Sequence, residues 1–149
     1  MTGRLIGIAR RAQPRAPMET LDAISVSTEA GVAGDIRGKP GKRQVTVLAL
    51  ESFRDALADL GLSPGRDTPW TLRRANLLVE GVALPRHAGA RLRIGELVLE
   101  VTGETDPCSR MDEQLPGLTA ALGPDWRGGV TCRVVAGAGI ALGDPVTVA

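Results

Sequence analysis

The sequence has few aromatic residues and few residues that bind structural metal ions. It contains one Phe, two Trp and no Tyr, so it lacks the stacking surfaces that bind single-stranded nucleic acids. Its formal net charge of +1 gives no excess of basic residues for a polyanion, so no nucleic acid partner is expected. Two cysteines and one histidine, without CxxC or HExxH spacing, cannot supply the ligands of a structural zinc site.

Long apolar runs are also missing. No segment approaches the roughly 20 apolar residues that cross a bilayer, and the apolar stretch from Leu5 to Ile8 is too short for a secretory signal. We therefore expect a cytoplasmic protein with no membrane partner. In a reducing compartment, a disulfide between Cys108 and Cys132 is not expected. The 149 residues suffice for one domain with its own hydrophobic core.

Short strand-like segments dominate the pattern of apolar residues. They are rich in β-branched residues or alternate apolar with polar positions, and they span residues 4–9, 21–27, 44–49, 72–79, 92–101, 130–135 and 146–148. The segment 92–101 alternates around Gly95-Glu96 and predicts a hairpin. Many short strands at close spacing predict a mainly β protein, a closed β-barrel decorated by a few short helices.

Helical spacing is confined to two regions. Apolar residues from Leu50 to Leu60 recur every three or four positions and predict an amphipathic helix that ends at Gly61. Residues 109–122 predict two short helical turns, because Pro116-Gly117 interrupts them. The glycine-rich segments 31–42 and 137–143 are interpreted as a loop and as a turn before the terminal strand.

Cys108 is the candidate reactive residue. It lies in a polar connection between a strand-like and a helix-like segment, where a thiol can ionise and act as a nucleophile or metal ligand. Arg110 would favour the thiolate and Asp106 would oppose it. A packed cysteine or an incidental loop residue are the alternatives. Cys132 lies in a β-branched run, which favours a structural role.

Two arginine-containing segments are candidate anion-binding sites. Arg73, Arg74 and Asn76 form the first segment, at the start of a predicted strand, where they either line an anion-accepting pocket or face water. In Arg127-Gly128-Gly129, two glycines let the backbone approach a ligand, and the adjacent guanidinium can bind a phosphate or carboxylate in a bidentate manner. A plain turn is the alternative for this second segment.

Several segments, taken in order, resemble the MOSC family, the molybdenum cofactor sulfurase C-terminal domain. The resemblance runs from about Gly31 to the C-terminus and depends on the order of its segments. These segments are Ala33-Gly34-Asp35, Arg43 to Leu48, Asn76 to Gly81, Gly89 to Gly95, Leu99 to Thr102, Pro107-Cys108, Arg127-Gly128-Gly129 and Gly139 to Val146. The chain departs from many relatives in having Ile36 after Gly-Asp, where they have histidine, and in having Arg74-Ala75-Asn76 where they often have glutamate before the asparagine.

The resemblance implies a single MOSC domain over residues 1–149, with a β-barrel of the pyruvate-kinase-barrel-like type. It implies that Cys108 carries sulfur or ligates molybdenum of the molybdenum cofactor (molybdopterin). The phosphate of this cofactor could then accept charge-assisted hydrogen bonds from Arg73, Arg74, Arg127 and the Gly128-Gly129 amides. Larger relatives join this module to a pyridoxal-phosphate cysteine desulfurase domain, for which these 149 residues have no room. A separate cysteine desulfurase or a redox partner is therefore expected.

The function expected from the sequence is cofactor binding or sulfur relay through Cys108, in redox or sulfur-transfer chemistry. The alternative is a non-catalytic module that captures an anionic ligand or a partner protein in the barrel mouth. The sequence leaves open whether the chain is an enzyme.

Overall fold

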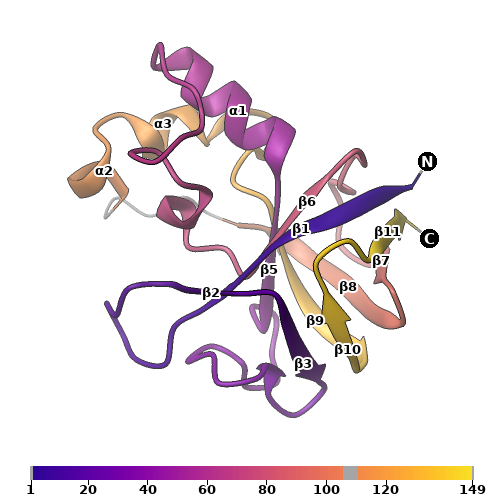
Figure 1. Ribbon diagram of the computed structural model, residues 1–149. Coiled ribbons are helices and arrows are strands. Elements are labelled where there is room, and N and C mark those ends of the chain that lie inside the picture. The colour runs from indigo at the N-terminus through magenta and orange to yellow at the C-terminus, as the bar shows by residue number, and fades with distance from the viewer. Residues whose placement is uncertain (1, 106–110, 149) are drawn as a thin grey trace.

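The computed structural model describes residues 2–105 and 111–148, and within them the chain is mainly β, with a closed barrel and a few short helices (Figure 1). Seven strands follow one another around the barrel in the order β11, β7, β8, β9, β5, β6, β1, and pairing of β1 with β11 closes the ring. Their bounds are β1 (Gly3–Arg10), β5 (Val45–Ala49), β6 (Leu77–Glu80), β7 (Arg91–Ile94), β8 (Leu97–Glu104), β9 (Val130–Ala136) and β11 (Pro145–Val148).

The remaining elements are attached to this barrel. Strand β2 (Glu19–Leu21) pairs with the end of β1, and a separate three-stranded sheet has the order β10 (Ala138–Ala141), β3 (Ala23–Ser27), β4 (Gly31–Val32). Helices α1 (Leu50–Asp59), α2 (Met111–Gln114) and α3 (Leu118–Ala121) gather on one side of the barrel (Figure 1). Two 3₁₀ turns span Trp70–Arg73 and Pro124–Trp126.

Side chains that point alternately inward and outward along the strands fill the barrel interior. In β5 the residues Val45, Val47 and Ala49 point into the barrel core, whereas Thr46 lines a cavity and Leu48 packs against the helices. Strand β1 breaks the alternation at a register shift between Leu5 and Gly7. This irregularity lets Leu5 and Ile8 both join the barrel core while Ile6 faces the helices.

A second apolar core lies outside the barrel. Phe53 and Leu57 of α1 pack with Leu118 of α3 against Leu48 and Leu78 of the barrel wall. Strands β5 and β6 thus carry apolar side chains on both faces. The helices cover the outer face and keep its apolar side chains from water. Among the described helices, none has the length and apolar character needed to cross a membrane.

The structure confirms the main predictions from the sequence and corrects three details. The 92–101 hairpin, the 50–60 helix and the two turns around Pro116-Gly117 are present. Segment 137–143 was predicted as a turn, but Ala138–Ala141 forms β10, because pairing with β3 rather than intrinsic propensity specifies this small-residue strand. Segment 21–27 is divided between two strands in different sheets.

The third correction concerns the two arginines that were placed at the start of a strand. Arg73 ends a 3₁₀ turn, Arg74 has a left-handed backbone with φ of 65°, and the strand begins only at Leu77.

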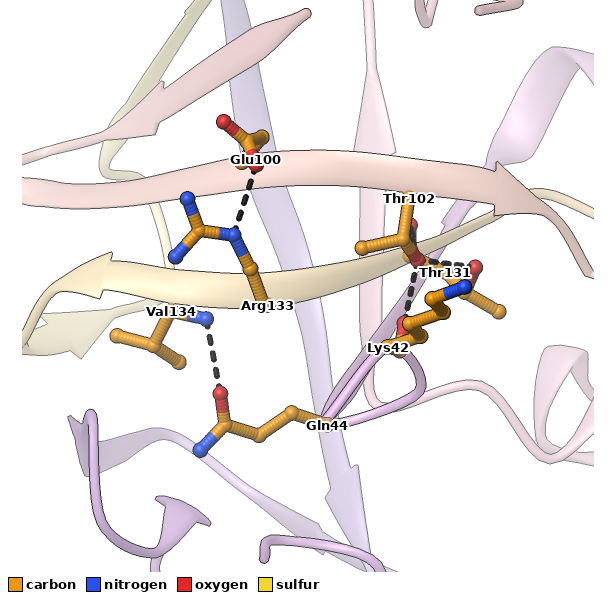
Figure 2. A network of polar contacts seen from close by, with 7 residues as sticks. All are labelled: Lys42, Gln44, Glu100, Thr102, Thr131, Arg133 and Val134. Atoms are coloured by element: carbon orange, nitrogen blue, oxygen red, sulfur yellow. Dashed lines mark hydrogen bonds and ion pairs between the residues drawn. The ribbon is translucent and has the colours of Figure 1, made fainter. Parts of the chain in front are cut away.

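Gln44 fastens the long 28–43 connection to the barrel. Its side chain is buried, and its Nε2 donates to the carbonyl oxygens of Thr28 (2.8 Å) and Gly38 (3.0 Å). Figure 2 shows its third hydrogen bond, in which Oε1 accepts from the Val134 N–H at 2.9 Å. Gly38 fits this packing only without a side chain, because an added Cβ would lie 1.7 Å from the Ala30 carbonyl oxygen. One amide thus positions a connection that lacks regular structure over most of its length.

Replacing Gln44→Ala should lower the free energy of unfolding by about 3 kcal/mol, because it leaves buried backbone groups without partners. The measurement is urea denaturation followed by circular dichroism. Gln13→Ala, at an exposed loop position, is the matched control and should change stability by less than about 0.5 kcal/mol. Equal loss in both variants would contradict this role for Gln44.

Candidate functional site

A cavity of about 570 Å³ opens between the outer wall of the barrel, the α2 turn and the two connections that follow β1 and β4. Thr46 of β5 and Thr131 of β9 form part of its wall, and Met111, Glu113 and Gln114 border it from α2. The other lining residues are Arg11, Arg15, Met18, Asp35, Ile36, Arg37, Arg43, Leu72, Arg73, Arg74, Asn76 and Thr105.

Positive charge dominates this lining. Among the described residues, six arginines line the cavity, against two acidic residues, Asp35 and Glu113. The carboxylate of Asp35 accepts hydrogen bonds from the backbone N–H groups of Arg11 (3.1 Å) and Arg37 (3.2 Å). Asp35 therefore holds together the two connections that carry Arg11 and Arg37. A cavity with this excess of guanidinium groups favours an anionic ligand.

Arg73 is fixed by the backbone of a distant segment. Its side chain is buried, and its Nε donates to the carbonyl oxygen of Gly128 at 2.8 Å. The guanidinium plane is thereby oriented at the cavity wall before any ligand arrives. The next residue, Arg74, has a left-handed backbone conformation and lines the same cavity.

Asn76 joins three strands at the cavity wall. Its Oδ1 accepts from the N–H (3.0 Å) and the hydroxyl (3.2 Å) of Thr46 in β5, and its Nδ2 donates to the Ala9 carbonyl oxygen in β1 at 3.2 Å. It directly precedes β6, which runs parallel to β5. Although Asn76 lines the cavity, most of its hydrogen-bonding capacity is used by the barrel.

Thr105 brings a buried hydroxyl group to the cavity. The residue is 9% exposed, and its Oγ1 has no hydrogen-bond partner within residues 2–105 and 111–148. Its backbone N–H donates to the Gly129 carbonyl oxygen at 3.0 Å, which fixes the end of β8. A buried hydroxyl without a partner is unfavourable unless a ligand or a water molecule forms a hydrogen bond with it. Thr105 is therefore a candidate hydrogen-bond donor to an anion.

A chain of threonine hydroxyls supports the cavity wall beside Arg43. The Thr102 hydroxyl donates to the Lys42 carbonyl oxygen and lies 2.7 Å from the Thr131 hydroxyl (Figure 2). A hydroxyl has one proton to donate. Since the Thr102 hydroxyl donates its proton to the Lys42 carbonyl oxygen, it accepts a hydrogen bond from the Thr131 hydroxyl. On the same strand pair, Arg133 donates to Glu100 at 2.7 Å and lowers the pKa of that carboxyl.

Cys108 lies outside the described residues, so its predicted role is not tested by the geometry. The nearest described residues on either side of it, Thr105 and Met111, both line the cavity. Cys132 faces the barrel core, and burial raises the pKa of its thiol to about 12. The structural role predicted for Cys132 is confirmed, and its thiol is unsuited to nucleophilic chemistry.

In the Arg127-Gly128-Gly129 segment, the Arg127 side chain does not line the cavity. Arg127 instead pairs with Asp59 of α1 at 2.5 Å, and this hydrogen bond raises the pKa of Arg127. Gly129 has φ of 94°, and an added Cβ would lie 2.2 Å from the Val47 carbonyl oxygen. The structure thus brings Arg73, Arg74 and Asn76 together and links this segment to them through the Gly128 carbonyl.

Sequence reasoning did not select Arg11, Arg15, Arg37 or Thr105 as binding residues, and it included Arg43 only in the basic segment Gly38 to Arg43, interpreted as a flexible loop that could contact an anion. The arginines come from two irregular connections, and no spacing in the sequence indicates that these connections meet. Besides that basic segment, the available signal was the preponderance of arginine over lysine, with only Lys39 and Lys42 as lysines.

Gly129→Ala should lower the free energy of unfolding by about 3 kcal/mol or more, because the methyl group meets the β5 backbone and the residue needs a left-handed conformation. Gly139→Ala is the matched control, since a Cβ there meets nothing within 4 Å. Thermal denaturation of both variants measures the difference. Similar stability for the two variants would contradict the expected steric clash between a side chain at position 129 and the β5 backbone.

Comparison with known proteins agrees with this architecture. A family model described as "MOSC domain" matches residues 31–147, whereas no curated protein sequence matches the chain. Among solved structures, the YuaD protein from Bacillus subtilis has a TM-score of 0.82 at 21% identity, covering 99% of this chain and 96% of that one.

Two further solved structures are similar to this chain. YiiM from Geobacillus stearothermophilus has a TM-score of 0.75 at 16% identity, covering 99% of this chain and 75% of that one. YiiM from Escherichia coli has a TM-score of 0.65 at 16% identity, covering 98% and 69%. At these identities the likeness establishes the fold alone. The family model spans most of the sequence, and the chain therefore belongs to the MOSC domain family.

Proposed function

We propose that this MOSC-domain protein binds the molybdenum cofactor or relays sulfur through Cys108, with the anionic part of its ligand in the arginine-lined cavity. The observation that carries the proposal is the cavity itself. It combines six arginines with the buried hydroxyl of Thr105. Thr105 and Met111, the described residues nearest to Cys108 in sequence, both line it.

The described residues fit the phosphate of a pterin cofactor. Guanidinium groups bind phosphate through paired, charge-assisted hydrogen bonds, and Arg73 is already oriented by Gly128. Arg73, Arg74 and the Thr105 hydroxyl would hold the phosphate, and Cys108 would offer a soft sulfur ligand. When bound, the cofactor would supply a molybdenum centre for redox chemistry.

Sulfur relay would use the same thiol in a different reaction. The Cys108 thiolate would attack the terminal sulfur of a persulfide on a cysteine desulfurase. A new sulfur–sulfur bond would form on Cys108 as the donor's sulfur–sulfur bond breaks, and the donor would leave as a thiolate. The oxidation levels balance, because the sulfane sulfur moves from one cysteine to the other without an added oxidant.

The other predicted binding residues take supporting roles in this proposal. Asn76 maintains the cavity wall through Thr46 and Ala9, and Gly128 acts through the Arg73 guanidinium. Arg127, engaged with Asp59, links the segment to α1. A cytoplasmic location belongs to the same proposal, because a reducing compartment keeps the Cys108 thiol free of disulfides.

Molybdenum and pterin analysis of the protein, purified from a molybdenum-replete host, tests cofactor binding. The chain should carry both, and Cys108→Ala should lose the molybdenum. Arg74→Ala should lower the pterin content about tenfold, because it removes a charge-assisted contact. Arg93→Ala is the matched control, since Arg93 is an exposed arginine on β7 away from the cavity.

If the metal is absent, incubation with a cysteine desulfurase and its cysteine substrate tests sulfur relay. Mass spectrometry should find one added sulfur on Cys108, with Cys132 unmodified because its raised pKa keeps it a thiol. Retention of a pterin or another anion by Cys108→Ala, with neither molybdenum nor added sulfur in the parent chain, would contradict both reactions and indicate a non-catalytic binding module.

A further inference from the structure

A second cavity, of about 420 Å³, lies at one end of the barrel. Its floor includes the buried side chains of Ala49, Val82 and Val130, all of which belong to the barrel core. Val130 lines this cavity and the next residue, Thr131, lines the arginine-rich one. Because successive residues of a strand point to opposite faces, strand β9 separates the two cavities.

The wall of this second cavity is apolar and includes an aromatic ring. Leu84, Pro85 and Trp126 line it, and Leu84 and Trp126 also pack against the barrel core. Asp125 and Trp126 have φ of 54° and 56°, in the left-handed region that costs energy for any residue with a side chain. The packing of Trp126 against the barrel core fixes the position of its indole, whereas the Asp125 side chain is exposed.

Carboxylates outnumber guanidinium groups around this cavity. Glu51 and Asp55 lie one turn apart on α1, and Asp125 lies beside Trp126, whereas Arg86 is the one described basic residue in the lining. The Arg86 Nη1 lies 4.0 Å from the Asp125 Oδ1, and both side chains are exposed. The Glu51 carboxylate accepts the Gly81 N–H at 2.9 Å and lies in the first turn of α1, where it offsets the positive end of the helix.

We propose that this second cavity binds an organic cation with an apolar body, such as an aromatic amine or amidine. The apolar body would enter against Leu84, Val82 and the Trp126 ring, which also attracts a cation through its π face. The cationic group would face Asp55 and Asp125. This charge preference is opposite to that of the arginine-lined cavity, and the proposal does not depend on the function assigned to that cavity.

Benzamidine is a suitable probe, because it joins a positive amidinium to a flat apolar ring. Its titration into the full-length chain should shift the Trp126 indole and Val82 amide resonances in a ¹H–¹⁵N spectrum. Benzyl alcohol and benzoate, which are neutral and negative, should bind at least about tenfold more weakly. The double variant Asp55→Asn/Asp125→Asn should weaken benzamidine binding about fivefold, as expected for two exposed charges.

Glu96→Gln, which removes an exposed carboxylate in the β7–β8 turn, is the control and should leave benzamidine binding unchanged. Equal binding of benzyl alcohol and benzamidine would overturn the proposal, because it would reduce the cavity to an apolar crevice. Unchanged affinity in the double variant, or shifts at Thr105 and Arg74 in place of Trp126 and Val82, would overturn it as well.

Discussion

The hydrogen bonds of Asn76 are the constraint on which the candidate site depends. Strand β6 pairs with the parallel strand β5 on one side and with β1 on the other, and Asn76, just before β6, hydrogen-bonds to Thr46 in β5 and to Ala9 in β1. Arg73 and Arg74 lie three and two positions before Asn76 in the sequence, so the anchoring of Asn76 constrains the backbone that carries both guanidinium groups. The barrel's own wall thus sets where positive charge is presented.

Backbone groups help to orient the charged lining of the cavity. The Gly128 carbonyl holds Arg73, and Asp35 binds the backbone amides of Arg11 and Arg37 rather than a guanidinium. Among the described residues, the lining contains six arginines and two acidic residues. An anion entering it meets donors that are already ordered, which reduces the entropy cost of binding.

The fold was more predictable from the sequence than the site. Alternation around Gly95-Glu96 and the three-and-four spacing from Leu50 to Leu60 are local patterns, and both elements formed as predicted. The cavity depends on non-local contacts. Arg11 and Arg37 meet through Asp35, and Gln44 reaches Val134 across 90 positions, so no short window of sequence carries the information. The family resemblance begins only at about Gly31, so it does not connect Arg11 with Arg37 either.

Titration of the full-length chain with inorganic phosphate, followed through arginine Nε–H and backbone resonances, tests the central claim most directly. The claim is that the cavity built around Asn76 is a preformed anion site. The account predicts saturable shifts concentrated at Arg73, Arg74 and Thr105, with Arg93 unaffected. Small, non-saturating shifts spread over exposed arginines, Arg93 included, would contradict it.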